Sequence, residues 1–157
     1  MIAKAATISH GGNAVRYSVN KDKAEIVKVN FLPDDISAEA MFQRMVLKQK
    51  EFSSIINKGR PLKRNVIRME ISPTKEESAG WTLADWVRLA NEYIRVFDSI
   101  DLSKKAKRAS AKFTNVKNSQ YVVALHHDAK SGIPHLHIDV NRVDMDGKVN
   151  DDHLIAE

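Results

Sequence analysis

The chain has 157 residues, which is the size of one domain with enough material to bury a core and too little for two. Hydrophobic residues make up 43% of it and charged residues 29%, and no apolar run approaches the about 20 residues that cross a bilayer. The chain has no cysteine and no apolar signal-peptide core, which excludes a disulfide scaffold and a thiolate metal site. We therefore expect a single soluble, cytoplasmic domain over residues 1–157, with no membrane partner.

The net charge of +5 is concentrated in one segment, residues 102–127, which contains no Asp or Glu. Its basic residues are Lys104, Lys105, Lys107, Arg108, Lys112 and Lys117. Outside it, 19 Lys and Arg residues stand against 20 Asp and Glu residues, a balance of −1. Such a run is commonly a solvated linker. The alternative is a loop that holds DNA phosphates through residues such as Lys104, Lys105, Lys107 and Arg108.

The first half of the chain predicts two strands and two helices. A short apolar run before a turn-forming cluster predicts strand, turn and short helix. Alternation then predicts a half-buried strand in which Val27, Val29 and Phe31 share a face. Apolar residues at helical spacing follow and predict an amphipathic helix. These elements are a strand over 2–7, a helix that runs through Tyr17, a strand over 25–31 and a helix over 37–56.

The second half predicts three strands and one helix. Period-two alternation predicts a strand over 66–71, and a capping box of Thr82 and Asp85 starts a helix over 82–98. Two runs of β-forming residues, 121–126 and 135–143, are separated by a segment that suits a hairpin connection. Strands and helices mix without regular βαβ units. The predicted class is therefore α+β, with a mainly antiparallel sheet flanked by helices.

Four of the six histidines lie between residues 126 and 137. Residues two apart in a strand share a face at about 6.6 Å, so His135 and His137 present two imidazoles side by side. The same alternation divides the rest of this strand into a polar face and an apolar face that packs on the core. The polar residues are Asp139 and Asn141, and the apolar residues are Leu136, Ile138 and Val140.

The preceding strand supplies a third imidazole, His126, which shares its face with Asp128. Three neutral imidazoles on adjacent strands leave open positions on a divalent metal, which is typical of a catalytic site. Imidazole suits Zn²⁺, Mn²⁺ or Ni²⁺ better than Mg²⁺ on intrinsic affinity. The alternative is a set of exposed strand histidines that bind no metal.

The residues His126-His127-Asp128 and the segment from Pro134 to Arg142 resemble the HxD and HxHxxxN signature of relaxases, the MOBP-like mobilisation nucleases of the HUH endonuclease group. The resemblance implies a palm-like antiparallel sheet and histidines that bind a metal on the scissile phosphate. Mg²⁺ or Mn²⁺ is the expected metal in use, and Zn²⁺ or Ni²⁺ is able to occupy the site. The implied partners are single-stranded or hairpin origin-of-transfer DNA and accessory mobilisation proteins.

In this family an N-terminal tyrosine attacks the phosphate and forms a 5′-phosphotyrosine link during plasmid or transposon mobilisation. Tyr17 fits the family's placement in the first helix, whereas Tyr93 and Tyr121 look like core residues. Ser72, at the end of a predicted strand and before a proline, matches the family's middle motif and is expected to touch DNA. Asp128 would orient a ligand histidine or take a proton.

Three further residues beside the motifs are predicted to support the site. Asn141 would support the histidine ligands from behind, and Arg16 and Arg142 would pair with phosphates unless they are ordinary surface arginines. The link between the two histidine motifs is about two residues longer than the family pattern. His127 therefore stays an alternative to His126 as the third ligand.

Two other functions fit part of the pattern. A metal-dependent phosphoesterase would use the histidines without tyrosine chemistry, and a non-catalytic nucleic-acid binding relative would keep the basic segment alone. The last residues read as the start of a helix, with Asn150 or Asp151 as its cap. We therefore expect the chain to be a relaxase domain truncated at its C-terminus.

Overall fold

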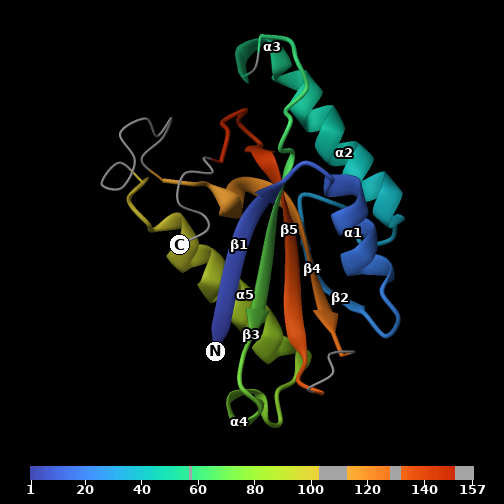
Figure 1. Cartoon of the computed structure of the whole chain (residues 1–157), viewed down its shortest axis with the longest axis vertical. Helices are drawn as coiled ribbons and strands as arrows, with labels where there is room; N and C mark the ends of the chain where they lie inside the picture. The colour runs from blue at the N-terminus through green and yellow to red at the C-terminus, as the bar shows by residue number, and fades with distance from the viewer. Residues whose placement is uncertain (57, 103–112, 128–131, 151–157) are drawn as a thin grey trace.

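A computed structural model describes residues 1–56, 58–102, 113–127 and 132–150 of the chain. They form a five-stranded sheet with helices on both faces (Figure 1). The elements are β1 (Ile2–Ile8), α1 (Gly11–Asn20), β2 (Glu25–Asn30), α2 (Ala38–Glu51), α3 (Ser53–Ile56), β3 (Val66–Ser72), α4 (Lys75–Ser78), α5 (Leu83–Asp98), the 3₁₀ helix η2 (Val116–Asn118), β4 (Ser119–His126) and β5 (His135–Asp144). No helix in this part of the chain is long and apolar enough to cross a membrane.

The sheet has the strand order β1-β3-β5-β4-β2, and every neighbouring pair is antiparallel. This arrangement confirms the predicted α+β class with an antiparallel sheet. The central strand β5 pairs with β4 through the hairpin and with β3 on its other side. Residues of β3 and β5 that are far apart in sequence are therefore neighbours in the middle of the sheet.

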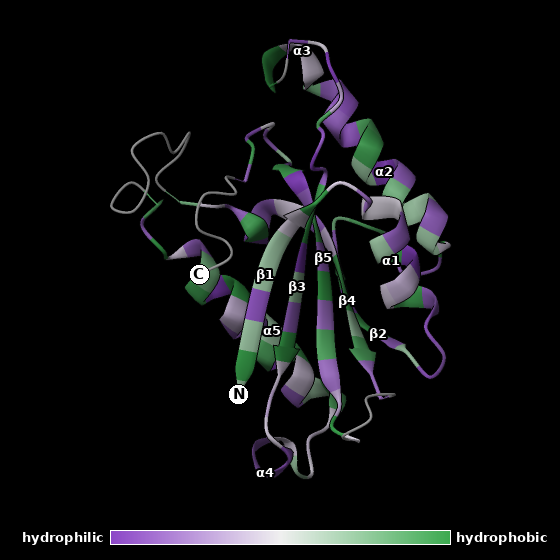
Figure 2. Ribbon diagram, viewed as in Figure 1, coloured by the Kyte–Doolittle hydropathy of each residue, from purple (hydrophilic) through white to green (hydrophobic). Residues whose placement is uncertain are grey.

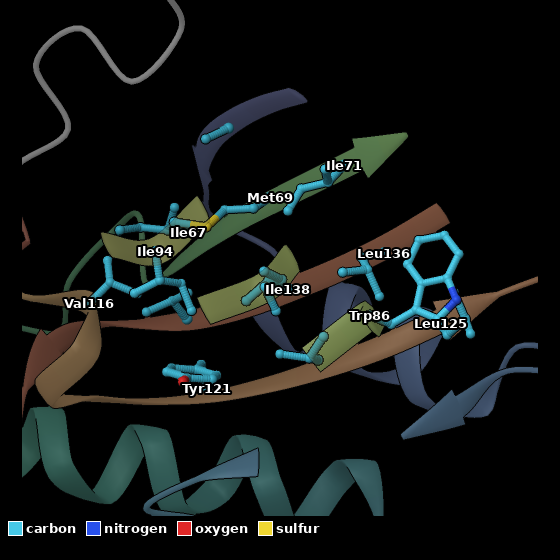
Figure 3. Close-up of a cluster of buried hydrophobic side chains, with 14 residues drawn as sticks. Ile67, Met69, Ile71, Trp86, Ile94, Val116, Tyr121, Leu125, Leu136 and Ile138 are labelled. Carbon is cyan, nitrogen blue, oxygen red and sulfur yellow. The ribbon is translucent and has the colours of Figure 1, made fainter. Parts of the chain in front are cut away.

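One face of the sheet packs on α5 and forms the larger core (Figure 3). Leu136, Ile138 and Val140 of β5 contribute to this core, as their alternation predicts, and Trp86 and Ile94 of α5 cover them. Thr82 and Asp85 form the predicted capping box at the start of α5.

The opposite face of the sheet lies under α1 and α2, which makes a second, smaller core. Val15 of α1, Met41 and Met45 of α2, and Val66 and Val122 of the sheet are all completely buried there. The polar side of β5 faces these helices, and the strand alternates in hydropathy along its length (Figure 2). The polar face is therefore a buried layer beneath two helices, which corrects the prediction that only one side of this strand packs on a core.

The helix predicted over 37–56 divides into α2 and α3 at Phe52. The ring of Phe52 lies against Gly147, so closely that a Cβ at Gly147 would overlap the ring atoms. The spacing of apolar residues predicted one continuous helix through Phe52. Local spacing does not reveal the contact with Gly147, because that residue is distant in the sequence.

The strand predicted over 25–31 ends at Asn30 and contains an irregularity. The register with β4 shifts between Ile26 and Lys28, as in a β-bulge, which adds a residue and reverses the alternation. Val27 therefore packs on the α5 side and Val29 on the α2 side, and not on one face as predicted. Phe31 lies beyond the strand with a positive φ of 55° and is exposed.

Candidate metal centre

Three histidines meet where β4 ends and β5 begins. One ring nitrogen from each of His126, His135 and His137 lies within 4.8 Å of the others. The ring centroids of His126 and His137 are 4.0 Å apart, and those of His135 and His137 are 4.9 Å apart. His127 lies outside this group, because its Nε2 is 3.4 Å from a Glu25 carboxylate oxygen on β2. The structure therefore brings together the predicted trio that contains His126.

Hydrogen bonding and burial prepare these rings for a metal. His126 Nε2 lies 2.8 Å from the Ser18 carbonyl oxygen on α1, so this nitrogen donates and Nδ1 is left for coordination. Both ring nitrogens of His137 are buried without a hydrogen-bond partner among the described residues. Burial, with the neighbouring charge of His126, lowers the pKa of His137 to about 3, so its ring is neutral at physiological pH. A divalent metal fits this donor set.

Glu70 of β3 is a member of this site that the sequence reasoning did not single out. It stands opposite His137 in the β3–β5 register, and its carboxylate lies 3.7 Å from His137 Nδ1. Burial alone would raise the pKa of Glu70, but the hydrogen bond from Lys4 and the positive charges of Arg68 and Lys4 outweigh burial and lower the pKa. Glu70 is therefore an ionised carboxylate beside a ligand ring. The alternation of the sequence predicted that Glu70 lies on the polar face of β3. It did not predict that β3 pairs with β5.

Tyr17 lies on α1 beside the histidine cluster. Its ring centroid is 5.5 Å from that of His126 and 5.7 Å from that of His137. Two cations lie over the same ring, Lys21 Nζ at 4.9 Å and Arg68 Cζ at 5.7 Å from the centroid. Tyr17 is 43% exposed, whereas Tyr121 is buried in the core on the α5 side. The exposed phenol and two cations thus lie beside the buried imidazoles of His126 and His137.

Comparison with protein families matches residues 16–156 to the family described as relaxase, MobA/VirD2-like, nuclease domain. The chain belongs to this relaxase family. The match includes Tyr17 and the whole histidine cluster. No curated protein and no solved structure matched in the other two comparisons. Members of the family are metal-dependent DNA-nicking endonucleases that act at origins of transfer, so the general function of this relaxase is DNA nicking.

The remaining residues predicted for the relaxase site are distributed over several surfaces. Ser72 lines an open pocket of about 550 Å³ together with Glu70 and His135, so it lies beside the metal centre. Arg16 is exposed on α1 and hydrogen-bonds to the Asn13 side chain. Asp128 and the basic residues Lys104, Lys105, Lys107 and Arg108 lie outside the described residues.

Two predicted site residues have different surroundings. The Arg142 side chain is buried, and its guanidinium donates to the backbone carbonyls of Asn150 and Arg64 at 2.9 and 3.0 Å. These bonds hold the backbone of two separate segments, and the phosphate contact of Arg142 stays a prediction. The Asn141 side chain bonds to α2 and β4, through Met45, Gln49 and Gln120, and to the backbone N–H of Val143. These bonds join the sheet to α2, and none of them reaches a histidine.

Asp139 is a further polar residue under α1. Its side chain is completely buried, and neither carboxyl oxygen has a hydrogen-bond partner within the described residues. Burial raises the pKa of Asp139 to about 7. The residue lies on the ligand strand β5, two positions after His137, without belonging to the group of possible ligands.

Proposed function

We propose that this relaxase is a metal-dependent, strand-specific transesterase that cuts single-stranded origin-of-transfer DNA through a 5′-phosphotyrosine on Tyr17. The observation that carries the proposal is the position of the Tyr17 ring against the rings of His126 and His137. A phosphate bound at the histidines would lie within reach of the phenol. The substrate and the mobilisation role follow from the family.

His126, His135 and His137 would hold the metal, and Glu70 would orient the His137 ring. A divalent metal bound there supplies Lewis-acid stabilisation of charge on the scissile phosphate. Lys21 and Arg68 add fixed positive charge beside the attacking ring. The Mg²⁺ or Mn²⁺ expected in use, and Zn²⁺ or Ni²⁺, all accept imidazole ligands, although Mg²⁺ does so least readily.

The reaction exchanges one phosphodiester for another. A phenol is protonated at neutral pH, so Tyr17 must lose its proton as it attacks. Asp128 is the proposed acceptor. The Tyr17 oxygen then bonds to phosphorus, the bond from phosphorus to the 3′ oxygen breaks, and the 3′ oxygen takes a proton. The products are a 5′-phosphotyrosine and a free 3′-OH.

Replacement of the nucleophile tests this proposal. Tyr17→Phe should bind a single-stranded oligonucleotide from the protein's own origin of transfer but form no covalent adduct on a denaturing gel with metal present. The matched control is Tyr93→Phe on α5, which should form the adduct as the unchanged chain does. Cleavage by Tyr17→Phe without an adduct would favour the metal-dependent phosphoesterase, and binding without cleavage by either chain would favour the non-catalytic relative.

A further inference from the structure

A second concentration of positive charge lies far from the histidines. Residues 44–64 contain seven Lys and Arg residues and one acidic residue, Glu51. The near-neutral balance outside 102–127 conceals this segment, because acidic residues elsewhere offset it. We define the basic protrusion as residues 44–56 and 58–64, which comprise the end of α2, α3 and the chain that returns to β3. Its basic residues are Arg44, Lys48, Lys50, Lys58, Arg60, Lys63 and Arg64.

Most of this charge is unbalanced. Lys48 pairs with Glu51 at 2.8 Å. Arg44, Lys50, Lys58 and Lys63 are exposed and make no ion pair in the described part of the chain. Clustered cations without counter-charges are the electrostatic signature of a surface that binds phosphates.

The basic protrusion is fixed to the sheet at its base. Gln49 of α2 donates hydrogen bonds to the Asn65 carbonyl at 2.9 Å and to the Asn141 side chain at 2.8 Å. Arg142 donates to the Arg64 carbonyl at 3.0 Å. These bonds connect the protrusion to β3 and β5, the two strands that carry Glu70 and His137. The base of the protrusion is therefore held to the strands that carry the metal centre.

The basic protrusion and the metal centre lie at opposite ends of the molecule. Figure 1 shows α3 at one end, and α4 with the β4–β5 hairpin at the other. From Asn65 to Glu70, β3 extends over about 17 Å. A duplex rises about 3.4 Å per base pair, so about five base pairs separate the base of the protrusion from the site. A single strand of about three nucleotides at the metal centre spans about 10 Å at this spacing and would not reach the protrusion.

We propose that the basic protrusion binds the phosphate backbone of double-stranded DNA beside the single-stranded segment held at the metal centre. The choice of DNA rests on the proposed function. Surfaces for single strands combine cations with aromatic rings on which bases stack. The protrusion has one aromatic residue, Phe52, and its ring is half-buried against Gly147. Cations without a stacking platform fit the backbone of a duplex.

Binding measurements at several salt concentrations test this inference. The variant Lys58→Gln with Lys63→Gln removes two cations of the protrusion. The control, Arg88→Gln with Arg95→Gln, removes two exposed cations from α5 on the other face of the sheet. Fluorescence anisotropy with chelator would follow a mixed-sequence duplex of about 30 base pairs and a single strand of about three nucleotides. Chelation prevents cleavage, so the readout is independent of Tyr17 chemistry.

The salt slope is the slope of the logarithm of the binding constant against the logarithm of the salt concentration. The protrusion variant should lower the magnitude of this slope for duplex binding by up to about 2, since each lost phosphate contact contributes about 0.9. The control should keep the slope, and neither variant should weaken binding of the short strand. An equal decrease of the slope in both variants would indicate that duplex binding depends on the overall positive charge of the protein. No decrease in the protrusion variant would indicate that the protrusion binds another partner, such as an acidic protein. Either result overturns the inference, whereas failure to form a tyrosine adduct would overturn the proposed function alone.

Discussion

The two ring nitrogens of His126 have different surroundings. Nε2 bonds to the Ser18 carbonyl, one residue after Tyr17, so the helix that carries the phenol also fixes a ligand ring. Such hydrogen bonds select the tautomer that coordinates a metal. His127 is directed to Glu25 and lies outside the histidine group. Two adjacent histidines thus have different surroundings, which the sequence left open.

Metal binding should distinguish these two histidines. His126→Ala should weaken metal binding by more than the about 10–100-fold that follows loss of a ligand's hydrogen-bond partner, because a ligand itself is lost. His127→Ala should leave affinity unchanged. Elemental analysis after dialysis, or titration calorimetry, measures both. Equal retention of metal by both variants, or by a variant with His135→Ala and His137→Ala, would exclude the site.

In metal-free protein, His137 and Asp139 contribute opposite slopes to the pH dependence of stability. The pKa of His137 falls from 6.5 to about 3 on folding, so stability drops as the pH falls below about 6.5 and the unfolded state takes up a proton. The pKa of Asp139 rises from 3.8 to about 7, so stability drops as the pH rises from about 4 to about 7 and the unfolded state releases a proton. Between about pH 4 and 6.5 the two slopes oppose each other.

Asp139→Asn should therefore reveal the contribution of His137 to the pH dependence of stability. The variant should lose up to about 1.4 kcal/mol of unfolding free energy per pH unit as the pH falls from about 6.5 to about 4.5. The unchanged chain should vary much less over that range. Urea unfolding in chelator measures the free energy at each pH. Parallel pH profiles for the two chains would show that Asp139 does not hold its proton in the folded state.

At the scale of elements, α1 is attached to the sheet at both ends. Near its start, the Gly11 backbone N–H donates to the Asn65 side chain at 3.2 Å, and near its end Ser18 contacts His126. The helix therefore has little freedom to shift relative to the histidines. Such attachment would give Tyr17 the accurate placement that the proposed in-line attack requires.

Gly11→Ala tests the attachment of α1. A Cβ at Gly11 would lie 2.5 Å from Asn65 Oδ1 and 2.5 Å from Val66 Cγ2. We expect a loss of about 1–3 kcal/mol in unfolding free energy, with slower adduct formation. Gly12→Ala is the matched control, because its nearest neighbour is the movable Phe42 ring at 3.1 Å and the gain in helix propensity offsets the contact. Equal stability of the two variants in urea unfolding would contradict this attachment.

Local patterns predicted the elements well where one periodicity holds over the whole segment. Thr82 with Asp85 marked the start of α5, and alternation in β5 separated its core residues from His135 and His137. Prediction failed where a distant contact decided the conformation, as at Phe52, or where a bulge reversed the alternation, as at Val27.

At the scale of the whole molecule, strand order decides which residues form the site. β3 and β5 are neighbours although many residues separate them, so Glu70 meets His137 across the sheet. The histidine spacing was sufficient to predict that histidines of two neighbouring strands come together, although it left open whether His126 or His127 is the third. Glu70, Lys21 and Arg68 required the three-dimensional arrangement. The relaxase site therefore combines local motifs with contacts that only the complete sheet creates.

The most direct test of tyrosine chemistry is to locate the DNA adduct on the chain. After reaction with single-stranded origin-of-transfer DNA and metal, trypsin releases Tyr17 on peptide 17–21, Tyr93 on 89–95 and Tyr121 on 118–130. Mass spectrometry should find the residual nucleotide on peptide 17–21, because Tyr17 alone among these tyrosines lies against the histidine rings. A nucleotide on either of the other peptides, or DNA cleavage that leaves no modified peptide, would contradict catalysis by Tyr17.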